Sequence, residues 1–305
     1  MPKKKISALV KSYADAAQAE STRTNYLRDM VHFTAWGGTV PASAEMIAEY
    51  VAAYASTLKV ATLAHRLAAI RQAHQDRGFA SPVGSPLVKK TMEGIRRSFG
   101  VAPRRVRALV KDDLVEVLVT VAQQKPLRAA RDKAMLLLGW AAALRRSELV
   151  ALTRDDVSDH ELGISLLIRK SKTDQRGVGD TVFVPKAKSK DRCPVLALRA
   201  WLELAGITSG ALFRQVSRHD YLVGERGLTP QAVAQVVQRA VCSAYGQEAS
   251  IDFAAHSLRA GYATSGVEAG LPVTDIMRVT RHKSAAILLN VYVRPNEKRQ
   301  TKSLL

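Results

Sequence analysis

The 305-residue sequence contains only two cysteines, Cys193 and Cys242, and 6% aromatic residues. Two cysteines provide neither a disulfide framework nor a set of metal ligands, and we expect both to be small core residues in a reducing compartment. No apolar run is long enough to cross a bilayer. The basic run at residues 3–5 is not followed by the apolar stretch that a secretory signal requires. We therefore expect a soluble, cytoplasmic protein with no membrane association.

Acidic side chains are also scarce. The 27 Asp and Glu stand against 46 Lys and Arg, which gives a formal net charge of +19. The excess is greatest toward the amino terminus, where residues 1–108 hold 17 basic and 7 acidic side chains. Such an excess favours a polyanionic partner, and nucleic acid is the first hypothesis. No carboxylate cluster suited to a metal ion is evident, so we expect no metal and no other cofactor.

The first hundred residues have the periodicity of helices separated by short polar breaks. Ser21-Thr22 can cap the first helix, and Ser85-Pro86 opens the fourth, with proline at its first helical position. Residues 1–100 are therefore predicted to form a helical bundle with little strand. Helices are expected over residues 21–36, 46–58, 63–78 and 85–100.

A run of basic residues follows this bundle. Within residues 89–111 the only acidic residue is Glu93, and the helical period lapses around Pro103. We interpret residues 101–110 as a basic linker between two domains. A charge run is often no more than a solvated surface, but its place between two globular stretches favours contact with a phosphate backbone. The candidate DNA-contacting residues are Lys89, Lys90, Arg96, Arg97, Arg104 and Arg105.

Residues 111–305 are predicted to form a second domain, mainly helical with a small antiparallel β-sheet. Two short β-prone runs, residues 163–169 and 181–185, flank a polar segment, which indicates a hairpin or a three-stranded sheet. The whole chain is therefore expected to be mainly α, in the α+β class. Helices are expected over residues 114–121, 129–143, 195–205, 230–244, 257–269 and 273–281.

Several groups in this second domain carry side chains suited to phosphoryl transfer. They are the run Leu144-Arg-Arg-Ser-Glu-Leu149, the box His256-Ser-Leu-Arg259, His282 and Tyr292. Attack on a phosphodiester builds negative charge on oxygen, which guanidinium groups hold well. A phenolic nucleophile forms a covalent intermediate that conserves the energy of the broken bond, and Lys or His must move the protons. Assembled in one site, these groups would cut and rejoin DNA without metal or ATP.

These groups resemble the signature boxes of the tyrosine recombinase (phage integrase) family. The resemblance is carried by Ala143–Leu149, His256–Arg259, Arg281-His282-Lys283-Ser284 and Tyr292. In the first domain, Ser21–Tyr26 with Phe33 and Trp36, and Thr62–Ile70, are similar to the helical core-binding domain of that family. The likeness covers nearly the whole chain. It implies a core-binding domain, a tyrosine-recombinase catalytic domain, and a site-specific recombinase or integrase of a mobile element.

The resemblance also implies roles for individual residues. Arg145 and Arg259 would bind the scissile phosphate, and Glu148 would support their site. His256 would assist proton transfer. His282 would donate a hydrogen bond to the phosphate. Arg146 is an equally available neighbour of Arg145, and the Leu-Arg-x-Ser-Glu-Leu context is what favours Arg145.

The same resemblance makes Tyr292 the nucleophile, which would form a covalent 3′-phosphotyrosine, and Lys172 the general acid. No other tyrosine lies downstream of Tyr245, so Tyr292 has no competitor in the terminal segment. In the first domain, Arg66 falls within the stretch that resembles the core-binding domain and is a further candidate DNA contact. Other lysines compete with Lys172 for its role: Lys170, Lys186, Lys188 and Lys190.

The resemblance further implies partners. Recombinases of this family act on double-stranded DNA as tetramers that hold two duplexes, and each protomer lends its carboxyl-terminal segment to a neighbour. Accessory DNA-bending proteins are a further class of partner that the resemblance admits.

The sequence departs from the pattern of the family in three places. Arg281 stands where the family usually has glycine, and the ten residues from His282 to Tyr292 are one more than is usual. One extra residue rotates a helical position by about 100°. The segment 171–180 also lacks the compact Gly-Lys-Gly style often found in the hairpin.

Two other functions are compatible with the same boxes. A type IB topoisomerase-like enzyme would relax DNA as a monomer, but the small size, the family-like bundle and the linker favour a recombinase. A catalytically silent DNA-binding regulator would keep the fold, and the altered spacing before Tyr292 favours that reading. A covalent adduct separates the enzyme from the regulator. Strand exchange between two sites separates the recombinase from the topoisomerase.

Overall fold

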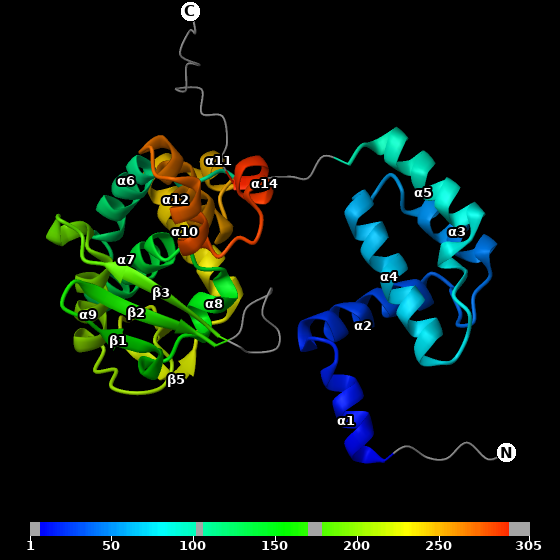
Figure 1. Ribbon diagram of the computed structural model, residues 1–305, viewed down its shortest axis with the longest axis horizontal. Helices are drawn as coiled ribbons and strands as arrows, with labels where there is room; N and C mark the ends of the chain where they lie inside the picture. Colours follow the sequence, from blue (N-terminus) through cyan, green and yellow to red (C-terminus); the bar gives the residue numbers. More distant parts are fainter. Residues whose placement is uncertain (1–6, 102–105, 170–178, 293–305) are drawn as a thin grey trace, which may run out of the picture. The chain divides into compact units, whose positions relative to one another are not determined.

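A computed structural model describes residues 7–101, 106–169 and 179–292 of the chain (Figure 1). The chain divides into two compact units, Met1–Arg104 and Arg105–Leu305. The described residues of the smaller unit form helices and no strand, whereas those of the larger unit combine helices with two small antiparallel sheets. The predicted class, mainly α with a small antiparallel sheet, is confirmed. The proposed linker at 101–110 includes residues 102–105, which lie outside the described residues.

Aromatic side chains are few in this protein, but several of them meet in the core of the smaller unit. Phe33 and Tyr50 are fully buried with their ring centroids 4.9 Å apart, and Trp36 packs against both. Leu63 is buried in the same cluster. The helices of this unit are α1 (Ala8–Ala16), α2 (Glu20–Ala35), α3 (Ala44–Ala53), α4 (Val60–Asp76), the 3-10 helix η1 (Pro82–Gly84) and α5 (Pro86–Phe99), and the core residues come from the region of α2 to α5.

Local sequence explains some of these helix ends and not others. Helix α5 begins as predicted, because the Ser85 side chain accepts a hydrogen bond from the amide of Val88 and Pro86 occupies the first turn. The predicted cap at Ser21-Thr22 is wrong: α2 already begins at Glu20, whose carboxylate suits the positive end of the helix dipole. Helix α3 begins two residues earlier than predicted, because Ser43 caps it by accepting from the amide of Met46.

The larger unit places helices around its two sheets (Figure 1). The helices are α6 (Lys111–Val121), α7 (Pro126–Ala141), α8 (Arg146–Ala151), η2 (Arg154–Asp156), η3 (Lys190–Arg192), α9 (Pro194–Leu204), α10 (Pro230–Tyr245), α11 (Gln247–Ser250), α12 (His256–Glu268), α13 (Val273–Thr280), α14 (Ala285–Ile287) and the π-helix η4 (Leu288–Tyr292). The strands are β1 (Val157–Asp159), β2 (Gly163–Ile168), β3 (Asp180–Pro185), β4 (Arg214–Val216) and β5 (Leu222–Gly227).

The first sheet is three-stranded, one of the two alternatives that the sequence left open, and its strand β1 lies outside the two predicted runs. Its order is β1-β2-β3, all antiparallel, and Leu166 of β2 pairs with Val182 of β3. Ile164, Leu166 and Ile168 are buried on the face that joins the main core. The β4–β5 hairpin was not predicted from the sequence, because β5 is largely exposed and contains Gly224, Glu225 and Arg226 in place of alternating apolar residues.

In the larger unit, two residues with left-handed backbone conformation follow the ends of helices α7 and α13. Helix α7 ends at Ala141, two residues before its predicted end, and Ala143 adopts φ 47° in the turn to α8. Helix α13 ends at Thr280, and Arg281 adopts φ 55° as its C-cap. Left-handed residues reverse the direction of the chain at a helix end. These two turns bring the segments after α7 and α13 toward α12.

Helix α12 is buried on most of its surface, and Gly261 lies where another segment crosses it. A Cβ atom at Gly261 would lie 1.7 Å from the carbonyl oxygen of Leu109. The same oxygen accepts a hydrogen bond from Nε1 of Trp140 at 3.0 Å. The absence of a side chain at Gly261 therefore allows the backbone around Leu109 to pack directly on α12.

We expect Gly261→Ala to lower the free energy of unfolding of the larger unit by at least about 1–3 kcal/mol, the usual cost of overpacking. Urea-induced unfolding followed by circular dichroism measures the change. Gly94→Ala in α5 of the smaller unit is the helical control, because a Cβ there meets no atom within 4 Å. It should be neutral or stabilising, since alanine favours the helix. An unchanged unfolding midpoint for Gly261→Ala would contradict the close packing.

Candidate active site

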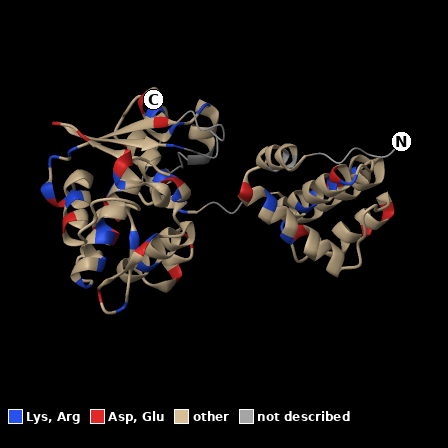
Figure 2. Cartoon of the chain, turned by 90° about the horizontal axis from the view of Figure 1, so that it is seen from below, with Lys and Arg blue, Asp and Glu red and all other residues tan. Residues whose placement is uncertain are grey.

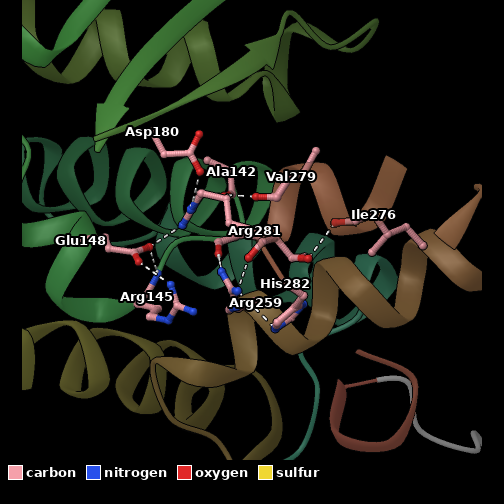
Figure 3. Close-up of polar contacts among 11 residues, drawn as sticks. Ala142, Arg145, Glu148, Asp180, Arg259, Ile276, Val279, Arg281 and His282 are labelled. Atoms are coloured by element: carbon pink, nitrogen blue, oxygen red, sulfur yellow. Dashed lines mark hydrogen bonds and ion pairs between the residues drawn. The ribbon is translucent and has the colours of Figure 1, made fainter. Parts of the chain in front are cut away.

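The amino-terminal end of α8 places Arg145 and Glu148 against each other. The backbone amide of Arg145 donates to Oε2 of Glu148 at 2.9 Å, and Nη1 of Arg145 donates to Oε1 at 2.7 Å (Figure 3). The Glu148 side chain is 1% exposed and that of Arg145 is 16% exposed. A buried carboxylate requires such compensation. The neighbouring Arg146 is exposed, so Arg145 is the arginine of this run that the structure brings into the cluster.

Arg259 projects from the first turns of α12 and is fully buried. Its Nη1 donates to the carbonyl oxygen of Ala143 at 2.7 Å, and its Nη2 donates to the carbonyl oxygen of Thr280. The Nη2 atom also lies 3.2 Å from Nε2 of His282. Arg259 thus links α12 to the turns that follow α7 and α13. The groups that contact this guanidinium would have to move away before it could bind a phosphate. The predicted phosphate contact of Arg259 therefore stays a prediction.

His282 lies beside this buried guanidinium and carries little charge at neutral pH. Burial lowers the pKa of His282 to about 3, and the positive charge of Arg259 adds to the effect, followed by that of Arg145. Because Nε2 faces an N–H of Arg259, the neutral ring acts there as an acceptor. His256 is exposed at the first residue of α12 and also lowers the pKa of His282, so the two predicted histidines lie in one electrostatic neighbourhood.

Arg281 belongs to the same cluster, although sequence reasoning did not place it among the site residues. Its side chain is 7% exposed, and Nη2 donates to Oε2 of Glu148 at 2.5 Å (Figure 3). Its Nε lies 4.0 Å from Oδ2 of Asp180 at the start of β3. Burial lowers the pKa of Arg281, while the carboxylate of Glu148 acts in the opposite direction. The arginine at a position where the resembling family usually has glycine was the feature of the sequence that could have identified it as a site residue.

Tyr292 is the last residue of the π-helix η4, and its side chain lies outside the described residues. The π-helix packs on α12, and its first residue, Leu288, is fully buried with Ala260 and Ile276. Lys172 also lies outside the described residues, as do the competing Lys170 and the linker residues Arg104 and Arg105.

The predicted DNA contacts of the smaller unit fall into two classes. Basic positions occur throughout both units (Figure 2). The exposed ones on α5 are Lys89, Lys90, Arg96 and Arg97, of which Arg96 and Arg97 lie 3.3 Å and 3.6 Å from the carboxylate of Glu93.

Arg66 differs, because its side chain is only 11% exposed. Its Nη1 donates to the hydroxyl of Tyr50 at 3.2 Å and contacts the ring nitrogens of His32, and its Nε lies 3.8 Å from Asp29. These internal contacts occupy the guanidinium, so a DNA contact from Arg66 stays a prediction.

Two other kinds of feature are absent from the described residues. Over residues 7–101, 106–169 and 179–292, no group of three or more His, Cys, Asp or Glu side chains could hold a metal ion. Across the same described ranges, none of the helices is long and apolar enough to span a membrane.

Comparisons with known proteins bear on the family and fold of the chain. The profile of the phage integrase family matches residues 108–299. The chain is 34% identical over 288 residues to an integrase/recombinase xerD homolog of Selenomonas ruminantium, a match that covers 92% of this chain and 83% of that protein.

Two solved structures share the fold. One is a lambda integrase dimer bound to a COC′ core site, with a TM-score of 0.61 and 18% identity over 96% of this chain and 78% of that chain. The other is the Tn1549 transposon integrase with transposon right end DNA, with a TM-score of 0.59 and 14% identity over 92% and 91% of the two chains. The fold, the clustered arginines and the match over 108–299 lead to one assignment: the chain belongs to the phage integrase family of tyrosine recombinases.

Proposed function

We propose that the protein is a site-specific DNA recombinase or integrase that cuts and rejoins duplex DNA through a covalent 3′-phosphotyrosine, without metal or ATP. The observation that carries the proposal is one cluster of cations: Arg145 and Arg281 pair with the buried carboxylate of Glu148, and the buried Arg259 lies against His282 beside them. Three guanidinium groups against one buried carboxylate leave a cationic site, which suits the anionic phosphate of a DNA strand.

The chemistry follows from these charges. The phenolic oxygen of Tyr292 attacks phosphorus, the bond from phosphorus to the 5′-oxygen breaks, and Arg145 and Arg259 stabilise the charge on the nonbridging oxygens. The phenol loses its proton to a base, for which His256 is our candidate, and the leaving 5′-oxygen receives a proton from an acid, for which Lys172 is our candidate. Attack by a new 5′-hydroxyl on the phosphotyrosine reverses these steps and rejoins the strand.

The π-helix η4 supports Tyr292 as the nucleophile in spite of the extra residue after His282. A π-helix closes its hydrogen bonds between residues i and i+5, one residue more than an α-helix. The turn Leu288–Tyr292 therefore takes up an additional residue without the full rotation that an α-helix would impose. The buried Leu288 fixes the start of this turn on α12.

The partners that we propose are double-stranded DNA and further copies of the chain. One structure of the same fold is a lambda integrase tetramer bound to a Holliday junction, and a tetramer in synapsis is the assembly we propose here. Accessory DNA-bending proteins and a cytoplasmic location remain predictions from the sequence.

We expect the wild-type protein to form a covalent adduct with a nicked suicide duplex in EDTA, and Tyr292→Phe to form none, because phenylalanine lacks the nucleophilic oxygen. Denaturing gel electrophoresis measures the adduct. The site is first mapped by sequencing DNA strands that become attached to the protein in a library of random duplexes. Tyr221→Phe is the control, because Tyr221 is 59% exposed and lies outside the cluster. Undiminished adduct with Tyr292→Phe would refute the nucleophile, and no wild-type adduct would favour a silent regulator.

Replacement of Arg96 and Arg97 by glutamine should flatten the dependence of DNA affinity on salt. Each lost phosphate contact lowers the slope of log affinity against log salt by about 0.9, with little change in sequence preference. Arg199→Gln is a single-charge control in the larger unit, where the exposed Arg199 pairs with Asp159 at 2.6 Å much as Arg96 and Arg97 pair with Glu93. Fluorescence anisotropy at several salt concentrations measures both slopes. Equal slopes for the wild type and the double variant would reject a phosphate contact from α5.

The low pKa of His282 should make the larger unit sensitive to acid. In the unfolded chain this imidazole is protonated at its ordinary pKa of 6.5, whereas in the folded chain its pKa is about 3. The neutral imidazole of His282 therefore makes its full contribution to the free energy of unfolding above pH 6.5, and this contribution is lost as the pH falls toward 3.

We expect wild-type protein to lose more unfolding free energy than His282→Gln between about pH 7 and about pH 4.5. Urea titrations at the two pH values measure the difference. An equal loss in both proteins would show that His282 has no lowered pKa in the folded state.

A further inference from the structure

The backbone at Arg281, where the resembling family usually has glycine, adopts a conformation that favours glycine. Arg281 caps α13 with φ 55°, in the left-handed region that costs most residues about 1–2 kcal/mol relative to glycine. An arginine in this conformation needs compensating contacts. Its Nη1 lies 3.2 Å from the carbonyl oxygen of Val279, and its Nη2 lies 2.5 Å from Oε2 of Glu148.

Arg281 changes the charge balance around Arg145. The two oxygens of Glu148 are divided, because Oε1 receives Arg145 while Oε2 receives Arg281 together with the backbone amide of Arg145. Without Arg281, Arg145 would be the side-chain cation that neutralises this buried carboxylate. With Arg281 present, the negative charge of Glu148 is compensated from the other side.

Exposure separates the two arginines. The side chain of Arg145 is 16% exposed, whereas that of Arg281 is 7% exposed and is directed toward Glu148 and the nearby carbonyl of Val279 (Figure 3). Arg145 is therefore the better placed of the two to meet a substrate, and Arg281 is the better placed to hold the carboxylate.

We propose that Arg281 is a positioning residue that neutralises Glu148, and so leaves the positive charge of Arg145 available to the scissile phosphate. The inference rests on the proposed function and assigns Arg281 no contact with DNA. It predicts that Arg281 affects the cleavage step more than DNA affinity, because the charge on phosphate oxygens increases in the transition state.

Arg281→Gly tests this role and removes the left-handed strain at the same time. We expect the observed rate of adduct formation at saturating suicide duplex to fall about 10- to 100-fold, the size expected for loss of one hydrogen bond between charged groups. The dissociation constant for DNA should change less than about threefold. Arg281→Lys keeps the charge and should recover part of the rate. Arg278→Gln, which removes a cation that is 80% exposed on the same helix, should leave the rate unchanged.

Glu148→Gln provides the decisive comparison, because it removes the charge that Arg281 is proposed to neutralise. In this background Arg281→Gly should cost less than about threefold in rate, since the two substitutions act on one interaction. A loss as large as in the wild-type background would overturn the proposal and indicate a direct phosphate contact. An unchanged rate in the Arg281→Gly single variant would overturn it as well.

A second measurement keeps the test valid if Glu148→Gln does not fold. A neutral methylphosphonate at the scissile position carries less charge for Arg145 to stabilise. On this duplex, the fold-decrease in adduct-formation rate caused by Arg281→Gly should be at least about fivefold smaller. An equal defect on both substrates would overturn the proposal. In each of these experiments, the wild-type protein must form an adduct and Tyr292→Phe must form none. Absence of the wild-type adduct would count against the proposed function, not against the role of Arg281.

Discussion

The buried guanidinium of Arg259 is the interaction on which the geometry of the site depends. It is fully buried and donates to the carbonyl oxygens of Ala143 and Thr280, which belong to the turns after α7 and α13. A buried charge requires hydrogen bonds to offset its lost hydration, and here backbone carbonyls supply them. The left-handed residues of these turns, Ala143 and Arg281, hold the segments in place. One side chain on α12 thereby fixes the segments that carry the other cations.

The same arrangement brings positive charges close together, and their mutual repulsion favours the binding of an anion. Arg145, Arg259 and Arg281 lie near one another, and the buried carboxylate of Glu148 compensates for only part of their charge. His282 fits among them because it stays neutral, since protonation would add another cation to a partly buried cluster. A phosphodiester would relieve this repulsion. The charges that repel one another in the free protein thus form a cationic cluster suited to an anion.

Local sequence predicts the elements of this fold better than it predicts the site. Helix α5 and the β2–β3 pair were predictable because a capping serine, a proline and alternating apolar residues act over short distances. The β4–β5 hairpin was not, since its exposed strand carries no apolar alternation. The choice of Arg145 over Arg146 came from its sequence context. The contact between Arg281 and Glu148 joins residues far apart in the chain, and no periodicity or spacing encodes it.

The departures from the pattern of the family are concentrated near the predicted nucleophile, and the structure accommodates two of them locally. Arg281 adopts a left-handed conformation at the end of α13, so the chain leaves this helix in a direction that glycine would also permit. The extra residue is followed by a π-turn that ends at Tyr292, while Leu288 remains fully buried against α12. The altered spacing was the feature that favoured a silent regulator. A π-turn spans one residue more than an α-helical turn, so the longer spacing ends in a turn that packs on α12, and the covalent adduct with Tyr292 is what separates an enzyme from a regulator.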